Sequence, residues 1–321
     1  MLENNTCFTN QIPRRIPRNY SSQAYVALLN GDVKDLLPQL PSESVDLIVS
    51  SPPYNIGKAY ESRTTTEQYL IFHGAVIKDL FRVLSKRGSI CWQVGNRYDN
   101  KELMPLDYLF YPLFKGAGFH LRNRVIWHYE HGLHATRKFS GRYETLLWFT
   151  KSDTYTFNLD SVRVPAKYPG KRHYKGPKKG KPSGNPLGKN PSDVWSVVVQ
   201  DWETGLWNIP NVKAHHPEKT IQPCQFPVEL AERCVLAFTN PGDLVFDPFA
   251  GVGSAMIAAA MWGRRSIGAE KEDSYYSIIL ERLKKLKAGN LTLRKLGKPI
   301  YVPPKNLKVA RPPEEWLRNN G

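Results

Sequence analysis

The chain has 321 residues, enough for one large domain or slightly more and too few for three. It carries 45 lysine and arginine residues against 29 aspartate and glutamate residues, a net charge of +16, for which a polyanionic partner is the simplest explanation. The 41% hydrophobic and 12% aromatic content excludes a disordered chain, and no apolar run approaches the roughly 18 residues of a membrane span.

Residues 1–20 are polar, with three arginines set among prolines, and are predicted to form a flexible arm. They contain no apolar signal core, so we expect a cytoplasmic protein. The four cysteines are far apart and none forms a CxxC pair, which predicts neither a disulfide framework nor a metal site.

Strand and helix signals alternate between residues 21 and 150. An apolar run at 25–29 precedes one or two helical turns at 32–40. Further strands are predicted at 45–49, 89–94, 121–129 and 143–150, and helices at 66–84 and 106–114.

Residues 161–190 have a different composition, with nine lysines and arginines, no acid, five glycines and five prolines. Such a stretch supplies little core and is predicted to be an irregular insert. A solvated linker is one interpretation, but the length and the absence of acids favour contact with nucleic acid. The candidate DNA-binding residues are Lys171, Arg172, Lys175, Lys178, Lys179 and Lys181.

Regular structure resumes with a helix at 226–238, predicted to be amphipathic with Glu229 and Glu232 on its polar side. Strands at 244–246 and 265–269 alternate with helices at 255–261 and 273–287. Alternating strands and helices predict a mostly parallel, doubly wound sheet, whose sites lie at the carboxyl ends of the strands.

The first chemical motif is Asp247-Pro-Phe-Ala-Gly251-Val-Gly253 with Glu270. Glycine between a strand and a helix lets the backbone approach a ligand closely, and an acid at the tip of the next strand suits the hydroxyls of a ribose. No lysine follows as a triphosphate-binding loop requires, so a nucleoside without polyphosphate is favoured. S-adenosyl-L-methionine is preferred over NAD and over a simple packing turn.

The second motif is Ser51-Pro52-Pro53-Tyr54-Asn55, at the end of a predicted buried strand. Two consecutive prolines remove two N–H donors, so carbonyl and hydroxyl acceptors dominate the rim. Such a rim can hold an exocyclic amine by its hydrogens, and Tyr54 can stack on a base extruded from a double helix. The alternative is a proline-rich turn that closes the strand.

Together the two motifs resemble the amino-methylating DNA methyltransferases, whose signature is (S/D/N)PP(Y/F/W). The resemblance covers residues 24–278, with 30–32 similar to the segment whose acid contacts the cofactor adenine and 216–223 similar to the segment around the cofactor methionine. The order of catalytic motif, basic region and glycine motif is the β arrangement of that family, in which the middle region is the target-recognition domain.

The resemblance implies a Rossmann-like α/β sheet of the S-adenosylmethionine-dependent methyltransferase type, with an irregular basic target-recognition insert. Five parts follow: an N-terminal arm (1–20), a catalytic half (21–150), the insert (151–212), a cofactor-binding half (213–288) and a basic C-terminal tail (289–321).

The same resemblance assigns roles to individual residues. Those implied in catalysis are Ser51, Pro52, Pro53 and Tyr54. Those implied in binding S-adenosyl-L-methionine are Asp32, Lys219, Asp247, Phe249, Gly251, Gly253 and Glu270.

The first residue of the signature bears on the substrate. Within the family, serine there occurs mostly in enzymes that methylate the N4 amine of cytosine, and aspartate or asparagine mostly in those that methylate the N6 amine of adenine. Ser51 therefore favours cytosine, although Asn55-Ile-Gly57 also occurs with adenine enzymes. An RNA methyltransferase and a non-catalytic DNA-binding protein are further alternatives.

Duplex DNA is the expected partner, with a separately acting restriction endonuclease as a possible second one and a monomer or homodimer as the assembly. Cys224 lies in a Pro-Cys-Gln triplet like that around the nucleophile of cytosine carbon-5 methyltransferases. It precedes Gly251 by 27 residues, whereas that nucleophile follows the glycine motif, so no catalytic thiolate is predicted. Residues 131–138, with Arg137 and Lys138, are predicted to face phosphate.

Overall fold

The computed structural model describes residues 25–58, 63–99, 101–129, 134–166, 168–195, 212 and 216–294. The predicted arm at 1–20 lies outside these residues, as do His131 and the tail beyond residue 294. Within the described ranges, no helix combines the length and the apolar character needed to cross a bilayer.

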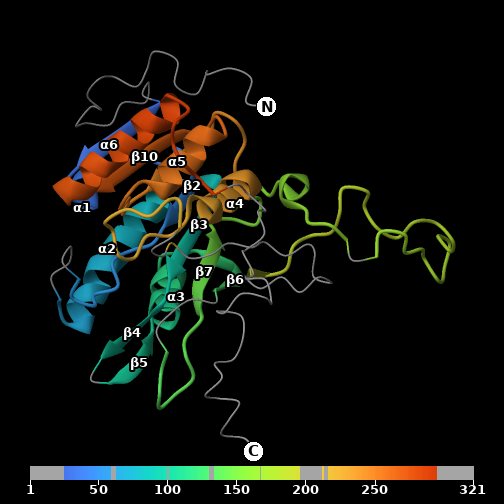
Figure 1. Cartoon of the computed structure of the whole chain (residues 1–321), viewed down its shortest axis with the longest axis horizontal. Helices are drawn as coiled ribbons and strands as arrows, with labels where there is room; N and C mark the ends of the chain where they lie inside the picture. Colours follow the sequence, from blue (N-terminus) through green and yellow to red (C-terminus); the bar gives the residue numbers. More distant parts are fainter. Residues whose placement is uncertain are drawn as a thin grey trace, which may run out of the picture.

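Eight strands of the described chain form one sheet, in the order β1-β10-β9-β2-β3-β7-β6-β8 (Figure 1). The first five run parallel, and β7 pairs antiparallel with both β3 and β6. The strands are β1 (Val26–Asn30), β2 (Val45–Ser50), β3 (Leu84–Val94), β6 (His120–His128), β7 (Tyr143–Thr150), β8 (Val194–Trp195), β9 (Leu244–Asp247) and β10 (Arg265–Glu270). A separate hairpin joins β4 (Asn96–Asp99) to β5 (Glu102–Pro105).

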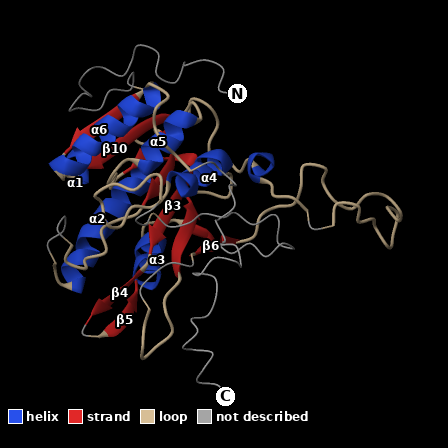
Figure 2. Ribbon diagram, viewed as in Figure 1, coloured by secondary structure: helices blue, strands red, loops and turns tan. Residues whose placement is uncertain are grey.

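Helices cover both faces of the sheet (Figure 2). One core contains the inner sides of α1 (Val33–Leu36), α2 (Thr66–Val83) and α3 (Leu106–Gly116). The other contains α4 (Val228–Phe238), α5 (Ser254–Met261) and one side of α6 (Asp273–Lys287). Short 3₁₀ turns occupy Leu37–Gln39 and Leu159–Val162. The predicted doubly wound, mostly parallel sheet is confirmed.

The two central strands fix where a ligand can enter. β2 lies next to β9, with Ile48 opposite Phe246. The chain leaves β2 toward α2 on one face of the sheet and leaves β9 toward α5 on the other. Because these connections diverge, a crevice opens at the carboxyl ends of β2 and β9, which is where open α/β sheets bind ligands.

The prediction that helix α4 has a polar side facing solvent was wrong. Every residue of α4 is buried, including Glu229 and Glu232. Arg294, from the segment after α6, forms an ion pair with Glu229, and the indole nitrogen of Trp262 donates to Glu232 at 2.7 Å. Polar partners from distant parts of the chain therefore allow Glu229 and Glu232 to be buried, although the sequence pattern predicts that they face solvent.

Residues 161–190 leave the body of the molecule and project far from the sheet (yellow-green in Figure 1). Their described part contains no helix beyond Leu159–Val162 and no strand, only isolated bridges such as the one between Val164 and Lys189. The Val164–Lys189 bridge closes the base of the projection, and β8 returns the chain to the sheet edge beside β6.

Candidate active site

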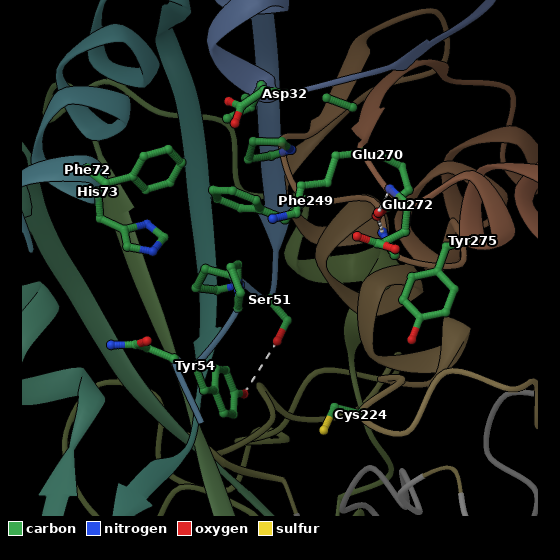
Figure 3. Close-up of a pocket in the computed structure, with 18 of the residues that line it drawn as sticks. Asp32, Ser51, Tyr54, Phe72, His73, Cys224, Phe249, Glu270, Glu272 and Tyr275 are labelled. Atoms are coloured by element: carbon green, nitrogen blue, oxygen red, sulfur yellow. Dashed lines mark hydrogen bonds between the residues drawn. The ribbon is translucent and has the colours of Figure 1, made fainter. Parts of the chain in front are cut away.

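A cavity of about 340 Å³ occupies the crevice at the carboxyl ends of the central strands. Figure 3 shows Asp32 at one end of the cavity, Tyr54 and Cys224 at the other, and Phe249 between them. The cavity brings together eight of the residues to which the sequence assigned catalytic or cofactor-binding roles: Asp32, Ser51, Pro52, Pro53, Tyr54, Phe249, Gly251 and Glu270.

Three predicted cofactor-binding residues do not line this cavity. Lys219 is exposed, and its Nζ donates to the Gln222 carbonyl at 2.8 Å. Gly253 precedes α5 and packs on Ile279, while Asp247 is fully buried beneath the cavity floor. This geometry therefore does not support direct contact between these three residues and a ligand in the cavity.

Asp247 instead joins the two chemical motifs. Ser50, the last residue of β2, donates its hydroxyl proton to Asp247 Oδ1 at 2.6 Å, and the Phe249 amide donates to the same oxygen at 3.2 Å. Ser50 precedes Ser51 directly, and Phe249 lines the cavity. One buried carboxyl group thus fixes the catalytic loop relative to the cofactor loop.

The loop from Ser51 to Asn55 is held on both sides. The Ser51 and Tyr54 hydroxyls lie 3.4 Å apart (Figure 3), and the Tyr69 hydroxyl donates to the Pro53 carbonyl at 2.8 Å. Asn55 has a left-handed backbone, with φ of 57°, which asparagine tolerates better than most residues. Its side-chain amide donates to the Thr64 carbonyl and accepts from the Thr64 amide, each at 2.8 Å, so the loop is pinned where it turns.

The cofactor side of the cavity is built around Glu270. Its two carboxylate oxygens accept backbone amides of Gly251 at 2.7 Å and Glu272 at 2.9 Å. Burial raises the pKa of Glu270, while these two hydrogen bonds act against that rise. Gly251 has φ of 54°, a conformation that favours glycine, and a Cβ there would lie 2.6 Å from Gln222 Nε2, so any other residue would displace the Gln222 side chain.

Several cavity residues carried no functional assignment in the sequence. Gln68, Tyr69, Phe72 and His73 come from the first turns of α2, and Tyr275 comes from α6. Helix α2 begins in a capping box between Thr65 and Gln68, and this T-x-x-Q pattern is visible in the sequence. The pattern predicts where the helix starts but not that its first turns face a ligand.

A smaller cavity of about 110 Å³ adjoins the first at Tyr54 and Cys224. Its polar wall is formed by Gln93, Tyr129 and Glu144. Gln93 Nε2 donates to Glu144, and the Tyr129 hydroxyl lies 3.4 Å from the same carboxylate. Burial raises the pKa of Tyr54, as does the negative charge of Glu144, so Tyr54 is a neutral phenol.

The candidate DNA-binding side chains lie elsewhere. Lys171, Arg172, Lys175, Lys178, Lys179 and Lys181 are all exposed on the projecting segment, and none lines either cavity. The backbone there folds back on itself, with the amide of His173 donating to the carbonyl of Lys181. These six positive charges are therefore separated in space from both cavities.

The residues present fit a nucleoside that has no phosphate. Asp32 and Glu270 offer oxygen acceptors for hydroxyl and amine groups, and Gly251 leaves room for close approach of a ligand. The lining includes three carboxylates, Asp32, Glu270 and Glu272, against one cation, Lys271, which suits a cationic ligand better than a polyphosphate. The cavity volume is within the range of sites for small molecules.

Comparison with known proteins agrees with this geometry. Residues 45–281 match the family model described as DNA methylase. The chain is 44% identical over 284 residues to the Type II methyltransferase M.BglII of Bacillus subtilis, covering 88% of this chain and 74% of that protein. It is 32% identical over 297 residues to the DNA adenine methyltransferase YhdJ of Escherichia coli K12, covering 87% and 94%.

A solved structure is similar as well. A candidate DNA modification methylase from Thermus thermophilus, complexed with S-adenosyl-L-methionine, superposes with a TM-score of 0.56 at 27% identity. The match covers 82% of this chain and 93% of that one.

Replacing Asp247 with asparagine should change how stability depends on pH. Burial raises the pKa of Asp247 to about 7, whereas an aspartate in an unfolded chain titrates near 4. Between these values the folded state holds a proton that the unfolded state has released, so this carboxyl makes the free energy of unfolding fall as pH rises from about 4 to about 7. Asp247→Asn removes that contribution, and urea denaturation at pH 5, 6, 7 and 8 measures the difference.

The variant should therefore gain stability relative to the wild type as pH rises toward 7, and the gain should level off above it. Ser50→Ala is the matched control, because it removes the hydrogen bond and leaves the carboxyl in place. A constant difference between wild type and Asp247→Asn across the series would contradict the raised pKa.

Proposed function

Because this chain belongs to the DNA methylase family, we propose that it methylates the N4 amine of cytosine in duplex DNA, with S-adenosyl-L-methionine as the methyl donor. Membership establishes an S-adenosylmethionine-dependent DNA methyltransferase. The choice of cytosine rests on one observation, the serine at position 51 of the Ser-Pro-Pro-Tyr loop, which lines the same cavity as Glu270.

The catalytic loop supplies acceptors and a stacking surface. An exocyclic amine donates its lone pair into the ring, so it is a poor nucleophile until its hydrogens are held out of the ring plane. Ser51 Oγ and the Pro52 carbonyl are the acceptors we assign to those hydrogens, because Tyr69 already occupies the Pro53 carbonyl. The same acceptors stabilise the positive charge that grows on the nitrogen. The ring of Tyr54 is the surface on which the extruded base stacks.

The cofactor half holds and orients the methyl donor. Asp32, Phe249, Gly251 and Glu270 surround the part of the cavity that we assign to the nucleoside. When bound, S-adenosyl-L-methionine supplies an electrophilic methyl group on a sulfonium, so the chemistry needs no covalent link to the enzyme. What the chain contributes is alignment of donor and amine, which the Asp247–Ser50 hydrogen bond supports by fixing one loop against the other.

A second candidate is methylation of the N6 amine of adenine. It is favoured by the 32% identity to YhdJ, which is named as a DNA adenine methyltransferase. Both bases present an amine beside a ring nitrogen, so the acceptors of the loop suit either one. The Type II relative M.BglII supports a role as the modification enzyme of a restriction system, with a separate endonuclease as partner.

The methylated nucleoside that the enzyme produces identifies the base that it modifies. Incubation of the protein with plasmid DNA and cofactor carrying a labelled methyl group, followed by digestion and mass spectrometry, should yield N4-methylcytosine. Labelled N6-methyladenine would establish the second candidate. In a parallel incubation with RNA, transfer of the label to RNA but not to duplex DNA would show an RNA methyltransferase. Absence of any transfer, with DNA binding retained, would show a non-catalytic protein.

Substitutions should separate chemistry from cofactor binding. Ser51→Ala should lower the rate of transfer by about 100-fold, the loss typical of removing one transition-state hydrogen bond, while leaving the Kd for S-adenosyl-L-methionine within about twofold. Glu270→Gln should instead weaken cofactor binding, measured by calorimetry. Glu281→Gln, an exposed glutamate on α6 outside the cavity, is the matched control. Equal loss of cofactor affinity in Ser51→Ala and Glu270→Gln would refute this division of roles.

Lysines of the projecting segment should set the salt dependence of DNA binding. Each lysine that neutralises a phosphate contributes about 0.9 to the slope of log affinity against log salt. Replacing Lys178, Lys179 and Lys181 together by glutamine should reduce that slope by roughly 0.9 for each phosphate that is no longer neutralised, with the cofactor Kd unchanged. The control replaces the exposed Lys78, Lys86 and Lys115, which lie on the body of the protein. An unchanged slope in the first variant would exclude these three lysines as phosphate contacts.

A further inference from the structure

The connection between β6 and β7 begins and ends at the smaller cavity. Tyr129 follows β6, Glu144 lies at the start of β7, and both line that cavity beside Tyr54. The Tyr129 amide donates to the Arg142 carbonyl at 2.8 Å, which closes the base of the loop. Because β7 runs antiparallel to β3, its first residues lie at the same edge of the sheet as the carboxyl ends of β2 and β3. The described residues of the loop, 134–142, therefore extend from the same end of the sheet as the catalytic motif.

Phe139 stands out in this loop. Its side chain is 100% exposed, and no other large hydrophobic residue of the described chain is fully exposed. Covering a phenylalanine ring removes apolar surface from water, so a partner that covers this ring is favoured by the hydrophobic effect. An isolated exposed apolar residue alone would carry no inference. Here two further observations support an inference: the position of Phe139 in the fold and the charges around this residue.

The loop is braced rather than free. The Ala135 amide donates to Ser140 Oγ at 3.0 Å, a bond that spans Phe139 and its neighbours. Lys138 Nζ lies 3.5 Å from the centre of the Tyr98 ring, so a cation–π contact ties the loop to the β4–β5 hairpin. In Figure 1 the loop and this hairpin extend from the same end of the molecule. Local contacts thus hold Phe139 outward.

The charges around Phe139 indicate the kind of partner. Residues 134–143 contain three cations, Arg137, Lys138 and Arg142, and no acid. A fully exposed aromatic ring between cations suits a partner that is both polyanionic and able to accept a ring between flat surfaces. Duplex DNA has both properties, since apolar side chains can enter between base steps while lysine and arginine neutralise the phosphates.

We propose that Phe139 is a wedge that enters the base stack of duplex DNA when the target base turns out toward Tyr54. The proposal rests on the proposed function, because it requires an extruded base. Phe139 is five residues from Glu144 on the cavity wall, so the chain can place it at most about 17 Å from that residue. The ring fills the space that the extruded base leaves and so favours the extruded state.

The test compares two duplexes that contain the methylation site mapped on plasmid DNA. In one duplex the target base is paired, and in the other it faces an abasic position, where extrusion costs little. Phe139→Ala should lower kcat/KM on the paired duplex by about tenfold or more and on the abasic duplex by less than about threefold. Phe139→Leu, which keeps an apolar wedge, should restore most of the activity on the paired duplex.

Because Phe139 is fully exposed, these variants should fold normally. An unchanged thermal unfolding temperature and an unchanged Kd for the cofactor would confirm that they do. Ile71→Ala is the matched control, an apolar residue 66% exposed on α2 and outside both cavities. Equal losses on the two duplexes, or full activity of Phe139→Ala on the paired duplex, would overturn the wedge. A wild-type protein that transfers no methyl group to any DNA would refute the proposed function instead.

Discussion

The hydrogen bond between Ser50 and Asp247 is the contact on which the site depends. These residues are 197 positions apart in the chain, yet they end the two neighbouring strands from which the catalytic loop and the cofactor loop depart. A short bond between buried groups leaves little freedom for one loop to shift against the other. Ser51 and Phe249, which follow these two strand ends, thus line one cavity in a fixed relation to each other.

Much of this arrangement could be predicted from sequence, because parallel strands place their carboxyl ends at one edge. Ser51, Tyr54, Phe249 and Glu270 each follow a predicted strand, and all four line the cavity. Asp247 could not be placed correctly, since nothing local reveals that its partner is Ser50. Tertiary contacts also decided the burial of Glu229, which pairs with Arg294 from beyond the last helix. The sequence predicts that a residue lies at the end of a strand, but it does not predict which distant residue that side chain will contact.

The basic character of the chain is distributed over separate surfaces. The acid-free segment from 161 to 190 projects from the sheet edge, whereas Arg137, Lys138 and Arg142 lie on a braced loop beside the smaller cavity. If all of the positive charge lay near the cavity, one surface would have to serve both DNA recognition and base extrusion. Under the roles proposed above, the projecting segment would provide affinity and register, while the loop at residues 134–142 would act where the DNA helix is distorted. Composition records only the total charge and cannot distinguish these positions.

The closure at the foot of the projecting segment has an evolutionary consequence. Val164 and Lys189 pair across its base, and β8 returns the chain to the edge of the sheet beside β6, several strands away from β2 and β9. Insertions, deletions or exchange of the residues in between leave both anchor points in place and impose no movement on the reacting groups. If the segment contacts DNA as proposed, it is an interchangeable module, and descendants of one ancestral enzyme would come to recognise different DNA sequences while inheriting the same catalyst.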